Sequence, residues 1–510
     1  MKPLAEVLRD WEAIIGLEVH TALTTLETKL FCGCKLGHDD EPNAHVCPVC
    51  LGLPGALPVP NEQAVEYIVM AGLATNCEVM RRSMFYRKHY FYPDMAKNFQ
   101  TTQGPVAFVM HGHLDLEMEG DAARERPDSV AAKAEDGSYV APIRILRIHL
   151  EEDAAKMVHV GGAEGRIGGA TESLIDYNRC GTPLIELVTE PDLRTPEEAR
   201  AFMEKLRQTF LALGISDCSL EKGSMRCDGN VSIRRRGTSG LGTKTELKNL
   251  NSFKSLHDAL AYEICRQAEV LEGGGVVRQE TRHWEPSRRR TVVMRVKETN
   301  DDYRFFPDPD LAPFDLSDEF VERCRARVGE LPDAKRDRYV QTFGLRKREA
   351  AMLVGDPAVA RLFEEAVQGA EGKVVGMVAN VMVNIVPTAP GADAAQVRSL
   401  AELLAADAVT FAQAHELLEA AVATGEDPAR VADERGWRQT TDVEVLSAIV
   451  DEVLGRCDEQ VRQYRAGNHK VVGYLVGQCM KAAHGSGNPK LFNRLLTERL
   501  GYHDNGNNGR

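Results

Sequence analysis

The 510-residue chain has no long apolar run and no excess of positive charge. Its longest apolar-rich stretch, Val374–Val386, contains two asparagines and stops at Pro387, whereas a membrane-spanning helix needs about 20 apolar residues. The first residues contain no apolar core of signal-peptide length. The formal net charge is −14, which argues against non-specific nucleic-acid binding by the whole surface. We therefore expect a soluble, cytoplasmic protein with no membrane partner.

Two common phosphate-binding signatures are also missing. The segment Gly242–Thr245 contains Gly-Thr-Lys-Thr but lacks the spacing of a GxxxxGK[ST] loop. The glycines between residues 161 and 169 fit no dinucleotide-binding fingerprint. Any nucleotide chemistry must therefore use a different phosphate site.

Composition and pattern nevertheless indicate a large folded protein. Hydrophobic residues make up 43% of the chain, enough for substantial cores, and the length suggests about three domains. Strand-like runs stop after Phe305–Pro309, and a helical period continues to the end. We predict an α+β protein with a mixed or antiparallel β-sheet domain and flanking helices over 1–317, an all-α domain over 318–435 and a small helical tail over 436–510.

Four of the twelve cysteines form two close pairs, with twelve residues between the pairs. These are Cys32, Cys34, Cys47 and Cys50. Four thiolates at this spacing can close a tetrahedral shell around zinc, and such a shell leaves no open position for catalysis. The spacing predicts a structural zinc knuckle over 32–50; the alternative is four unligated thiols. The other eight cysteines are expected to be reduced and buried.

A strand pattern over Ile14–His20 places two reactive side chains next to each other. Side chains alternate along a strand, so Glu18 and His20 share one face and Leu17 and Val19 share the other. A neighbouring carboxylate and imidazole can bind a metal or move a proton. The same alternation is also typical of a half-exposed strand whose polar face has no function.

More acids occur in later strand-like segments. Glu151, Glu152 and Asp153 follow a strand over 143–150, where they are either solvated or gathered on a cation. Glu186 lies inside an apolar run, where an isolated carboxylate is costly unless a metal or an arginine pairs with it.

Asp228 lies in a fourth strand-like segment, Ser224–Ser232. If these strands share one sheet, their acids can converge, and crowded carboxylates then need a cation between them. Oxygen ligands suit Mg²⁺ or Mn²⁺, and a magnesium site in a cytoplasmic enzyme most often handles a nucleotide phosphate. The residues themselves thus indicate metal-dependent phosphoryl chemistry without a P-loop, and they leave RNA contact open.

Helix signals are clear at several places. Thr195 is expected as an N-cap, with Pro196 in the first position and Glu198 completing a capping box. A second amphipathic helix is predicted from Ser252, and Thr441 is expected to cap a third.

Two segments suit contact with RNA. Phe85–Asp94 interleaves aromatic residues with Arg87, Lys88 and His89, a pattern that can stack a base and bind phosphates, or that can pack its aromatics in a core with solvated cations. Residues 461–510 carry a net charge of +6, whereas 401–460 carry −10. The basic segment indicates contact with a phosphate backbone or with the acidic surface of the chain itself.

Long stretches of the chain resemble one family. The matching stretches are IGLEVH (15–20), FYRKHYFYPD (85–94), HLEEDAAK (149–156), IDYNRCGTPLIEL (175–187), GSMRCDGNVSIR (223–234), TELKNLNSF (245–253), DDYRFFPDPDL (301–311) and GYLVGQCMKAAHGSGNP (473–489). In these stretches the chain resembles the B subunits of the bacterial aspartyl/glutamyl-tRNA amidotransferases over nearly its whole length. The optional zinc knuckle of that family is present in full.

The resemblance implies ATP-dependent amidation of Glu-tRNA(Gln), Asp-tRNA(Asn) or both. A protein of this family phosphorylates the side-chain carboxylate of the misacylated tRNA, and ammonia from the amidase partner, the A subunit, then displaces phosphate. A heterotrimer that also contains the small C subunit is implied with it. So are a cradle-shaped kinase domain, bound ATP and Mg²⁺, a structural Zn²⁺ and a tRNA-binding tail.

Positions in the family motifs imply roles for individual residues. The magnesium and ATP site is expected to contain Glu18, His20, Glu152, Glu186 and Asp228. Lys88 and Glu152 are expected where an ammonia channel opens, as catalytic groups that pass or deprotonate ammonium. The choice of Glu152 over Glu151 rests on the motif, and the alternative for His20 is to orient the metal ligands without touching the metal. Two rival functions are a metal-dependent hydrolase and a non-catalytic RNA-binding scaffold.

Overall fold

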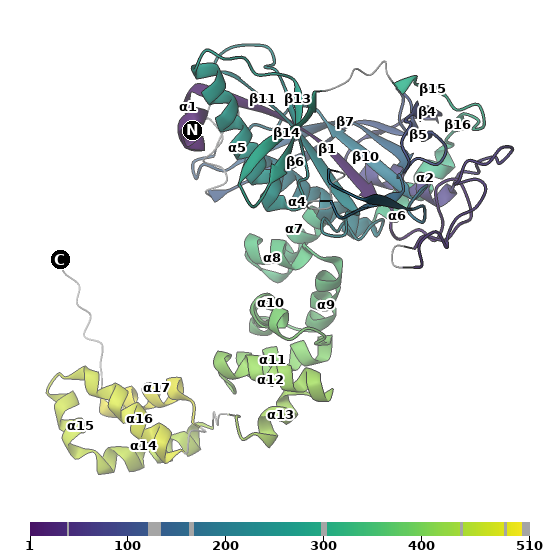
Figure 1. Cartoon of the computed structure of the whole chain (residues 1–510). Coiled ribbons are helices and arrows are strands. Elements are labelled where there is room, and N and C mark those ends of the chain that lie inside the picture. Colours follow the sequence, from purple (N-terminus) through teal and green to yellow (C-terminus); the bar gives the residue numbers. More distant parts are fainter. Residues whose placement is uncertain are drawn as a thin grey trace. The chain divides into compact units, whose positions relative to one another are not determined.

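The structure is a computed structural model, and it describes residues 1–37, 40–120, 134–162, 168–296, 303–438, 442–483 and 487–501. The chain forms two compact units, Met1–Leu331 and Pro332–Arg510, which are traced along the chain in Figure 1. All described strands belong to the first unit, and the second unit is helical. The predicted α+β class, with a sheet-rich N-terminal part and a helical C-terminal part, is therefore confirmed. The finer division at residues 317 and 435 stays a prediction.

The described part of the first unit is built on a mixed sheet of twelve strands. At its centre β1 (Trp11–Ala22) lies between β10 (Pro183–Thr189) and β11 (Met225–Arg235), antiparallel to both. On the β10 side follow β7 (Tyr139–Glu152), β5 (Phe99–Gln103), β4 (Phe85–His89) and β15 (Phe306–Pro307), and β6 (Val109–Met118) joins β7 to β2 (Glu78–Val79). On the β11 side follow β12 (Thr245–Lys248), β13 (Glu280–Glu285) and β14 (Arg290–Val296), with a parallel pairing between β12 and β13. Two small sheets pair β3 (Arg82–Ser83) with β16 (Phe314–Asp315) and β8 (Lys156–Val160) with β9 (Glu172–Asp176).

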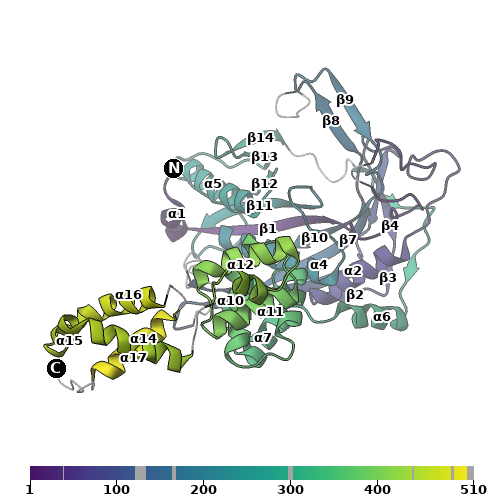
Figure 2. The same ribbon diagram turned by 90° about the horizontal axis from the view of Figure 1, so that it is seen from below.

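Helices cover one face of this sheet. They are α1 (Leu4–Asp10), α2 (Glu62–Ala74), α4 (Pro196–Leu213) and α5 (Phe253–Glu272), and α6 (Asp318–Val328) packs against α2. Seen from below in Figure 2, α2 and α4 lie next to each other along the sheet. Their apolar side chains form one hydrophobic core with inward-facing strand residues such as Leu17, Val19 and Leu187. The other face of the central strands is therefore left for polar side chains.

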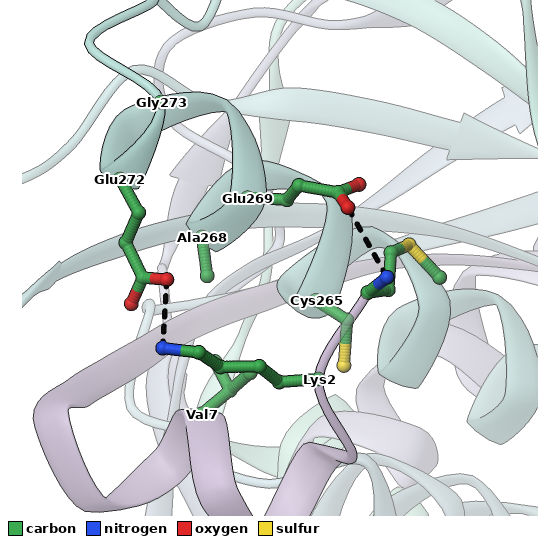
Figure 3. Close-up of a pocket in the computed structure, with 8 residues that line it drawn as sticks. Lys2, Val7, Cys265, Ala268, Glu269, Glu272 and Gly273 are labelled. Atoms are coloured by element: carbon green, nitrogen blue, oxygen red, sulfur yellow. Dashed lines mark ion pairs between the residues drawn. The ribbon is translucent and has the colours of Figure 1, made fainter.

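A pocket of about 440 Å³ lies between α1 and α5 (Figure 3). Two ion pairs border it, from the Met1 amino group to Glu269 at 3.1 Å and from Lys2 Nζ to Glu272 at 2.9 Å. These partly exposed pairs connect the first residues of the chain to α5. None of the residues expected at the catalytic site lines this pocket.

The start of α4 follows the predicted signal only in part. The Thr195 side chain accepts a hydrogen bond from Glu198 N, and Gly214 ends the helix in the left-handed conformation. The capping box is incomplete, because Glu198 accepts hydrogen bonds from Arg194 N and from the Tyr139 hydroxyl. The carboxylate thus ties α4 to β7 as well as to the preceding turn.

The second unit is built from short helices. They are α7 (Pro332–Phe343), α8 (Lys347–Val354), α9 (Pro357–Val367), α10 (Lys373–Asn384), α11 (Ala394–Ala405), α12 (Phe411–Thr424), α13 (Pro428–Glu434), α14 (Val443–Arg456), α15 (Asp458–Arg465), α16 (Val472–Ala482) and α17 (Pro489–Leu500), with 3₁₀ turns at Val386–Thr388 and His469–Val471. One hydrophobic cluster involves α7 to α13, and a separate one involves α14 to α17. The N-cap of α14 is Asp442, not the expected Thr441, which lies outside the described residues. Among the described residues, no helix is both long enough and apolar enough to span a membrane.

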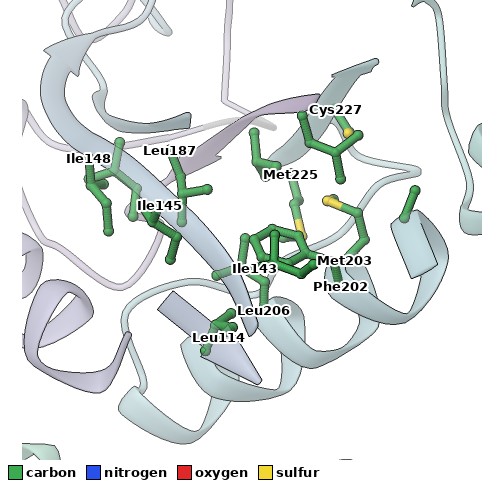
Figure 4. Packing of buried hydrophobic residues seen from close by; sticks show 14 of the residues in the cluster. Leu114, Ile143, Ile145, Ile148, Leu187, Phe202, Met203, Leu206, Met225 and Cys227 are labelled. Atoms are coloured by element: carbon green, nitrogen blue, oxygen red, sulfur yellow. The ribbon is translucent and has the colours of Figure 1, made fainter. Parts of the chain in front are cut away.

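The packing of α4 on the sheet positions the polar face opposite. Phe202, Met203 and Leu206 point from α4 toward Ile143 of β7 and Met225 of β11 (Figure 4). Phe202 and Leu206 are fully buried. This contact holds together the two strands that lie on either side of the β1–β10 pair.

We predict that Phe202→Ala lowers the free energy of unfolding of the first unit by about 3–5 kcal/mol, because it removes a buried ring and leaves a cavity. Urea unfolding followed by the fluorescence of Trp11 and Trp284 measures the change. Gln208→Ala, at a partly exposed position of the same helix, is the matched control. Equal stability of the two variants would contradict the packing described.

Candidate active site

Strand β1 places its two reactive side chains on the polar face of the sheet. Leu17 and Val19 are buried in the core, so Glu18 and His20 point the other way. Antiparallel registry sets His20 opposite Glu186 of β10 and sets Glu18 opposite Asp228 of β11. Residues directly opposite one another on neighbouring strands share a face. The register thus gathers the predicted side chains without any need for a long loop.

His20 lies at the centre of a group of carboxylates. Its Nε2 atom is 3.4 Å from Glu186 Oε2, 3.8 Å from Glu18 Oε1 and 4.0 Å from Glu151 Oε1. One ligand atom from each of Glu18, His20 and Glu186 lies within 4.8 Å of the others. We call Glu18, His20, Glu151 and Glu186 the acidic cluster.

The neighbouring carboxylates favour a protonated ring at His20, because they raise its pKa. Burial alone would lower the pKa of His20, but Glu186, Glu151 and Glu18 raise it to about 9. Burial would raise the pKa of Glu186, yet its hydrogen bond and attraction to His20 lower it to about 2. An imidazolium therefore supplies the positive charge among the acids at neutral pH.

One imidazolium does not balance all the acids of the cluster. Burial, followed by repulsion from Glu186, raises the pKa of Glu151 to about 7. The same two causes raise the pKa of Glu18. Carboxylates with raised pKa values indicate a site that favours additional positive charge. Oxygen ligands in this arrangement suit Mg²⁺, and the residues present therefore fit that ion.

Asp228 lies next to the acidic cluster and is paired with a lysine side chain. It forms an ion pair with Lys248 of β12, and Lys248 also lies 3.7 Å from Glu246. Burial lowers the pKa of Lys248, but Asp228 and Glu246 raise it overall. The structure thus brings Glu18, His20 and Glu186 together and places Asp228 on the same face in a neighbouring ion pair.

The two glutamates that end β7 point to opposite sides of the sheet. Glu151 faces the acidic cluster and accepts a hydrogen bond from Thr102 Oγ1 at 2.9 Å. Glu152 forms an ion pair with Lys97, and its Oε1 atom accepts a hydrogen bond from Thr101 N at 2.9 Å. Strand alternation therefore places Glu151, and not Glu152, on the face of the acidic cluster. Glu152 is the residue that the family motif favours for the site.

Lys88 of β4 lies close enough to the acidic cluster to interact electrostatically with two of its carboxylates. Its charge lowers the pKa values of Glu151 and Glu186, and its Nζ atom lies 5.2 Å from the ring centre of Tyr303. Phe85 packs in the core as the sequence alternative allowed, whereas Phe91 remains exposed. The predicted segment therefore contributes one aromatic ring to the core and one cation near the acidic cluster.

The four clustered cysteines also converge. One Sγ atom from each of Cys32, Cys34, Cys47 and Cys50 lies within 4.8 Å of the others. Cys47 N donates a hydrogen bond to Cys50 Sγ at 3.1 Å. This set of donors fits a tetrahedral metal ion such as Zn²⁺.

Several site residues were missed by sequence reasoning. Glu151 is the first case, because two adjacent glutamates on a strand cannot be told apart until the register with β10 is known. Lys97 follows β4 in an irregular loop, where no periodic pattern predicts its direction. His149 is a third case: burial lowers its pKa to about 4, and its Nε2 atom has no hydrogen-bond partner.

Comparison with known proteins gives a consistent result. The model of the GatB/GatE catalytic domain matches residues 13–322, and the model of the GatB domain matches residues 363–500. The B subunit of an aspartyl/glutamyl-tRNA(Asn/Gln) amidotransferase from Carboxydothermus hydrogenoformans is 43% identical over 502 residues, which cover 97% of this chain and 99% of the relative. The protein of the same name from Moorella thermoacetica is 44% identical over 500 residues, covering 96% of this chain and 100% of the relative.

The charge balance predicts how stability changes with pH when no metal is added. The pKa of His20 is raised from 6.5 to about 9 by folding, so its stabilising effect is complete below pH 6.5 and is lost as pH rises through 9. The difference in unfolding free energy between wild type and His20→Gln should therefore shrink by roughly 2–3 kcal/mol between pH 6 and pH 10. Urea unfolding in EDTA measures it.

His159→Gln is the control for this experiment. It removes an imidazole on β8, outside the acidic cluster, and should show no comparable change with pH. A difference between wild type and His20→Gln that stays constant from pH 6 to pH 10 would contradict the imidazolium at the centre of the cluster.

Proposed function

Because the chain belongs to the B-subunit family of the aspartyl/glutamyl-tRNA(Asn/Gln) amidotransferases, we propose that it amidates Glu-tRNA(Gln), Asp-tRNA(Asn) or both by way of an acyl phosphate. As one component of a glutamine-hydrolysing, tRNA-dependent amidotransferase, it is part of a carbon–nitrogen ligase that uses ATP. The observation that carries the phosphoryl-transfer step is the convergence of Glu18, His20 and Glu186 on one face of the sheet.

Activation of the carboxylate explains the need for ATP. A carboxylate at neutral pH is a poor electrophile because its leaving group is an oxide. The side-chain oxygen of the tRNA-bound amino acid attacks the γ-phosphorus of ATP, and the bond to ADP breaks. Ammonia then attacks the acyl carbon with its lone pair, and phosphate leaves with the bonding electrons. The product is an amide on the same tRNA.

The acidic cluster provides the phosphoryl-transfer site in this proposal. Glu18, Glu186 and Asp228, together with His20, would hold Mg²⁺ and so orient ATP. When bound, Mg²⁺ neutralises charge on the phosphate oxygens. For direct coordination, His20 must give up its proton; if it does not touch the metal, it keeps the proton and orients a carboxylate ligand. Lys248 holds Asp228 in place through their ion pair.

Proton transfer from ammonium is assigned to groups at the end of β7 and on β4. The motif places Lys88 and Glu152 in this role. We add Glu151 as a candidate, because burial and repulsion by Glu186 raise its pKa to about 7, close to the value that suits a general base at neutral pH. Glu152 is already paired with Lys97, which suits a residue that fixes the neighbouring loop.

The partners follow from the same family assignment. Ammonia would come from the A subunit, an amidase that hydrolyses glutamine, and the small C subunit would complete a heterotrimer. The tail over 436–510 would contact tRNA. In the described part of that tail, Arg462, Arg465 and Lys470 are basic residues available for phosphate, whereas Lys490 pairs with Asp407 and Arg499 pairs with Asp451. A cytoplasmic location follows from the proposed substrate.

The cysteine pairs are proposed to bind a structural zinc ion. The four Sγ atoms already face one another, and four protein ligands leave no open position for a reacting water. The zinc would fix the loop between β1 and α2. It would take no direct part in amidation.

We predict that Glu186→Gln lowers amide formation by at least about a hundredfold, because the site loses one of its magnesium ligands. The assay contains the assembled complex, misacylated tRNA, ATP and Mg²⁺, and it supplies ammonium chloride so that glutamine hydrolysis is bypassed. Aminoacyl-tRNA bearing Gln or Asn is quantified. Glu78→Gln, an exposed position on β2, is the control and should retain full activity.

The same assay separates the rival functions. A metal-dependent hydrolase would act without ATP, and a non-catalytic scaffold would tolerate Glu186→Gln. Equal amide formation by wild type with and without ATP would overturn the acyl-phosphate route. Comparing Glu151→Gln with Glu152→Gln at limiting ammonium then shows which of the two carboxylates handles the proton.

A further inference from the structure

A lysine is completely buried next to the cysteine pairs. Lys29 lies in the segment after β1, and none of its surface is exposed. Its Nζ atom donates hydrogen bonds to His45 O at 2.8 Å and to Tyr177 O at 3.1 Å. The same atom lies 3.7 Å from Cys50 Sγ. The ammonium group is therefore fixed at the edge of the four-sulfur group.

The burial of this ammonium needs an explanation. Moving a charged group out of water is costly unless an opposite charge lies nearby. Two carbonyl oxygens satisfy its hydrogen bonds but supply no net charge. Among the described residues, the structure gives Lys29 no ion pair with a carboxylate. Among the groups of the described chain that can carry negative charge, the Cys50 sulfur lies beside the ammonium group at 3.7 Å.

A metal-bound state of the four cysteines would supply that charge. Zinc is bound by thiolates, so four cysteine ligands around a divalent ion leave two net negative charges. A buried site with that charge is itself costly without a neighbouring cation or donors to the sulfur atoms. The positive charge of Lys29 and the negative charge of the thiolate shell would thus offset each other's cost of burial.

Lys29 also joins the knuckle to the strand that carries Glu186. It contacts the Tyr177 carbonyl, and the loop of the knuckle is held to the same turn by a hydrogen bond from His45 N to Asn178 Oδ1 at 2.8 Å. Cys180 Sγ lies 3.6 Å from Cys50 O. This turn runs directly into β10.

We propose that Lys29 is a positioning residue of the metal site, whose ammonium group offsets the charge of a tetrathiolate zinc centre and fixes that centre against the turn before β10. This inference rests on the proposed zinc site. It predicts that metal affinity depends on the charge at position 29 and not on Lys35, the one lysine within residues 32–50.

The test measures zinc affinity of the full-length chain by competition with a chromophoric chelator, together with the thiolate-to-metal absorption of the Co²⁺-loaded chain. Lys29→Gln should weaken zinc binding by about 10–100-fold, because it keeps a hydrogen-bond donor but removes the charge. Lys29→Arg keeps the charge and should bind zinc more tightly than Lys29→Gln. Lys35→Met, at an exposed position of the same knuckle, is the matched control and should bind zinc like wild type.

Equal zinc affinity of Lys29→Gln and Lys35→Met would overturn the role of Lys29 while leaving the zinc site intact. Wild type that binds neither Zn²⁺ nor Co²⁺ would instead overturn the zinc site itself, and the inference with it. A second readout is thermal unfolding with and without zinc. The rise in melting temperature caused by zinc should be smaller in Lys29→Gln and Lys29→Met than in wild type; an undiminished rise contradicts the proposal.

Discussion

Repulsion between closely spaced carboxylates, of which Glu151 is buried and Glu18 and Glu186 are partly exposed, is the constraint on which the candidate site depends. Glu18, Glu151 and Glu186 surround one imidazole, and each of the three approaches His20 Nε2 to within 4.0 Å. A protonated His20 balances part of this charge, and the raised pKa values of Glu18 and Glu151 show that a deficit remains. The remaining negative charge would favour a cation with more charge than an imidazolium. This is the property that a magnesium–nucleotide site requires.

The hydrophobic core maintains this unfavourable arrangement. β1 lies between β10 and β11, and its apolar side chains are buried beneath the helices of the first unit. Because side chains alternate on a strand, fixing Leu17 and Val19 inside the core also fixes Glu18 and His20 outside it. Burial of apolar surface thus offsets the electrostatic cost of the acidic cluster. The proposed zinc knuckle would likewise help to hold the turn before β10 in place.

Local patterns in the sequence were sufficient for part of this picture. The helix from Pro196 was predicted from the N-cap Thr195 and from proline in the first position, and the α+β class was predicted from the change of period. Glu18, His20 and Glu186 were expected to converge because they lay on strand-like segments. The choice between Glu151 and Glu152 could not be settled in this way, since it depends on how β7 pairs with β10. Lys97 and Lys29 lie outside periodic segments, and their directions depend on tertiary contacts.

In the function proposed above, the acidic cluster binds the divalent ion that accompanies ATP. The most direct measurement is anomalous diffraction from crystals of the complex grown with Mn²⁺ and a non-hydrolysable ATP analogue. We expect a manganese peak bonded to oxygen atoms of Glu18 and Glu186, with the triphosphate on the same face of the sheet. A peak that lies away from these carboxylates, with the acidic cluster unchanged, would contradict the account.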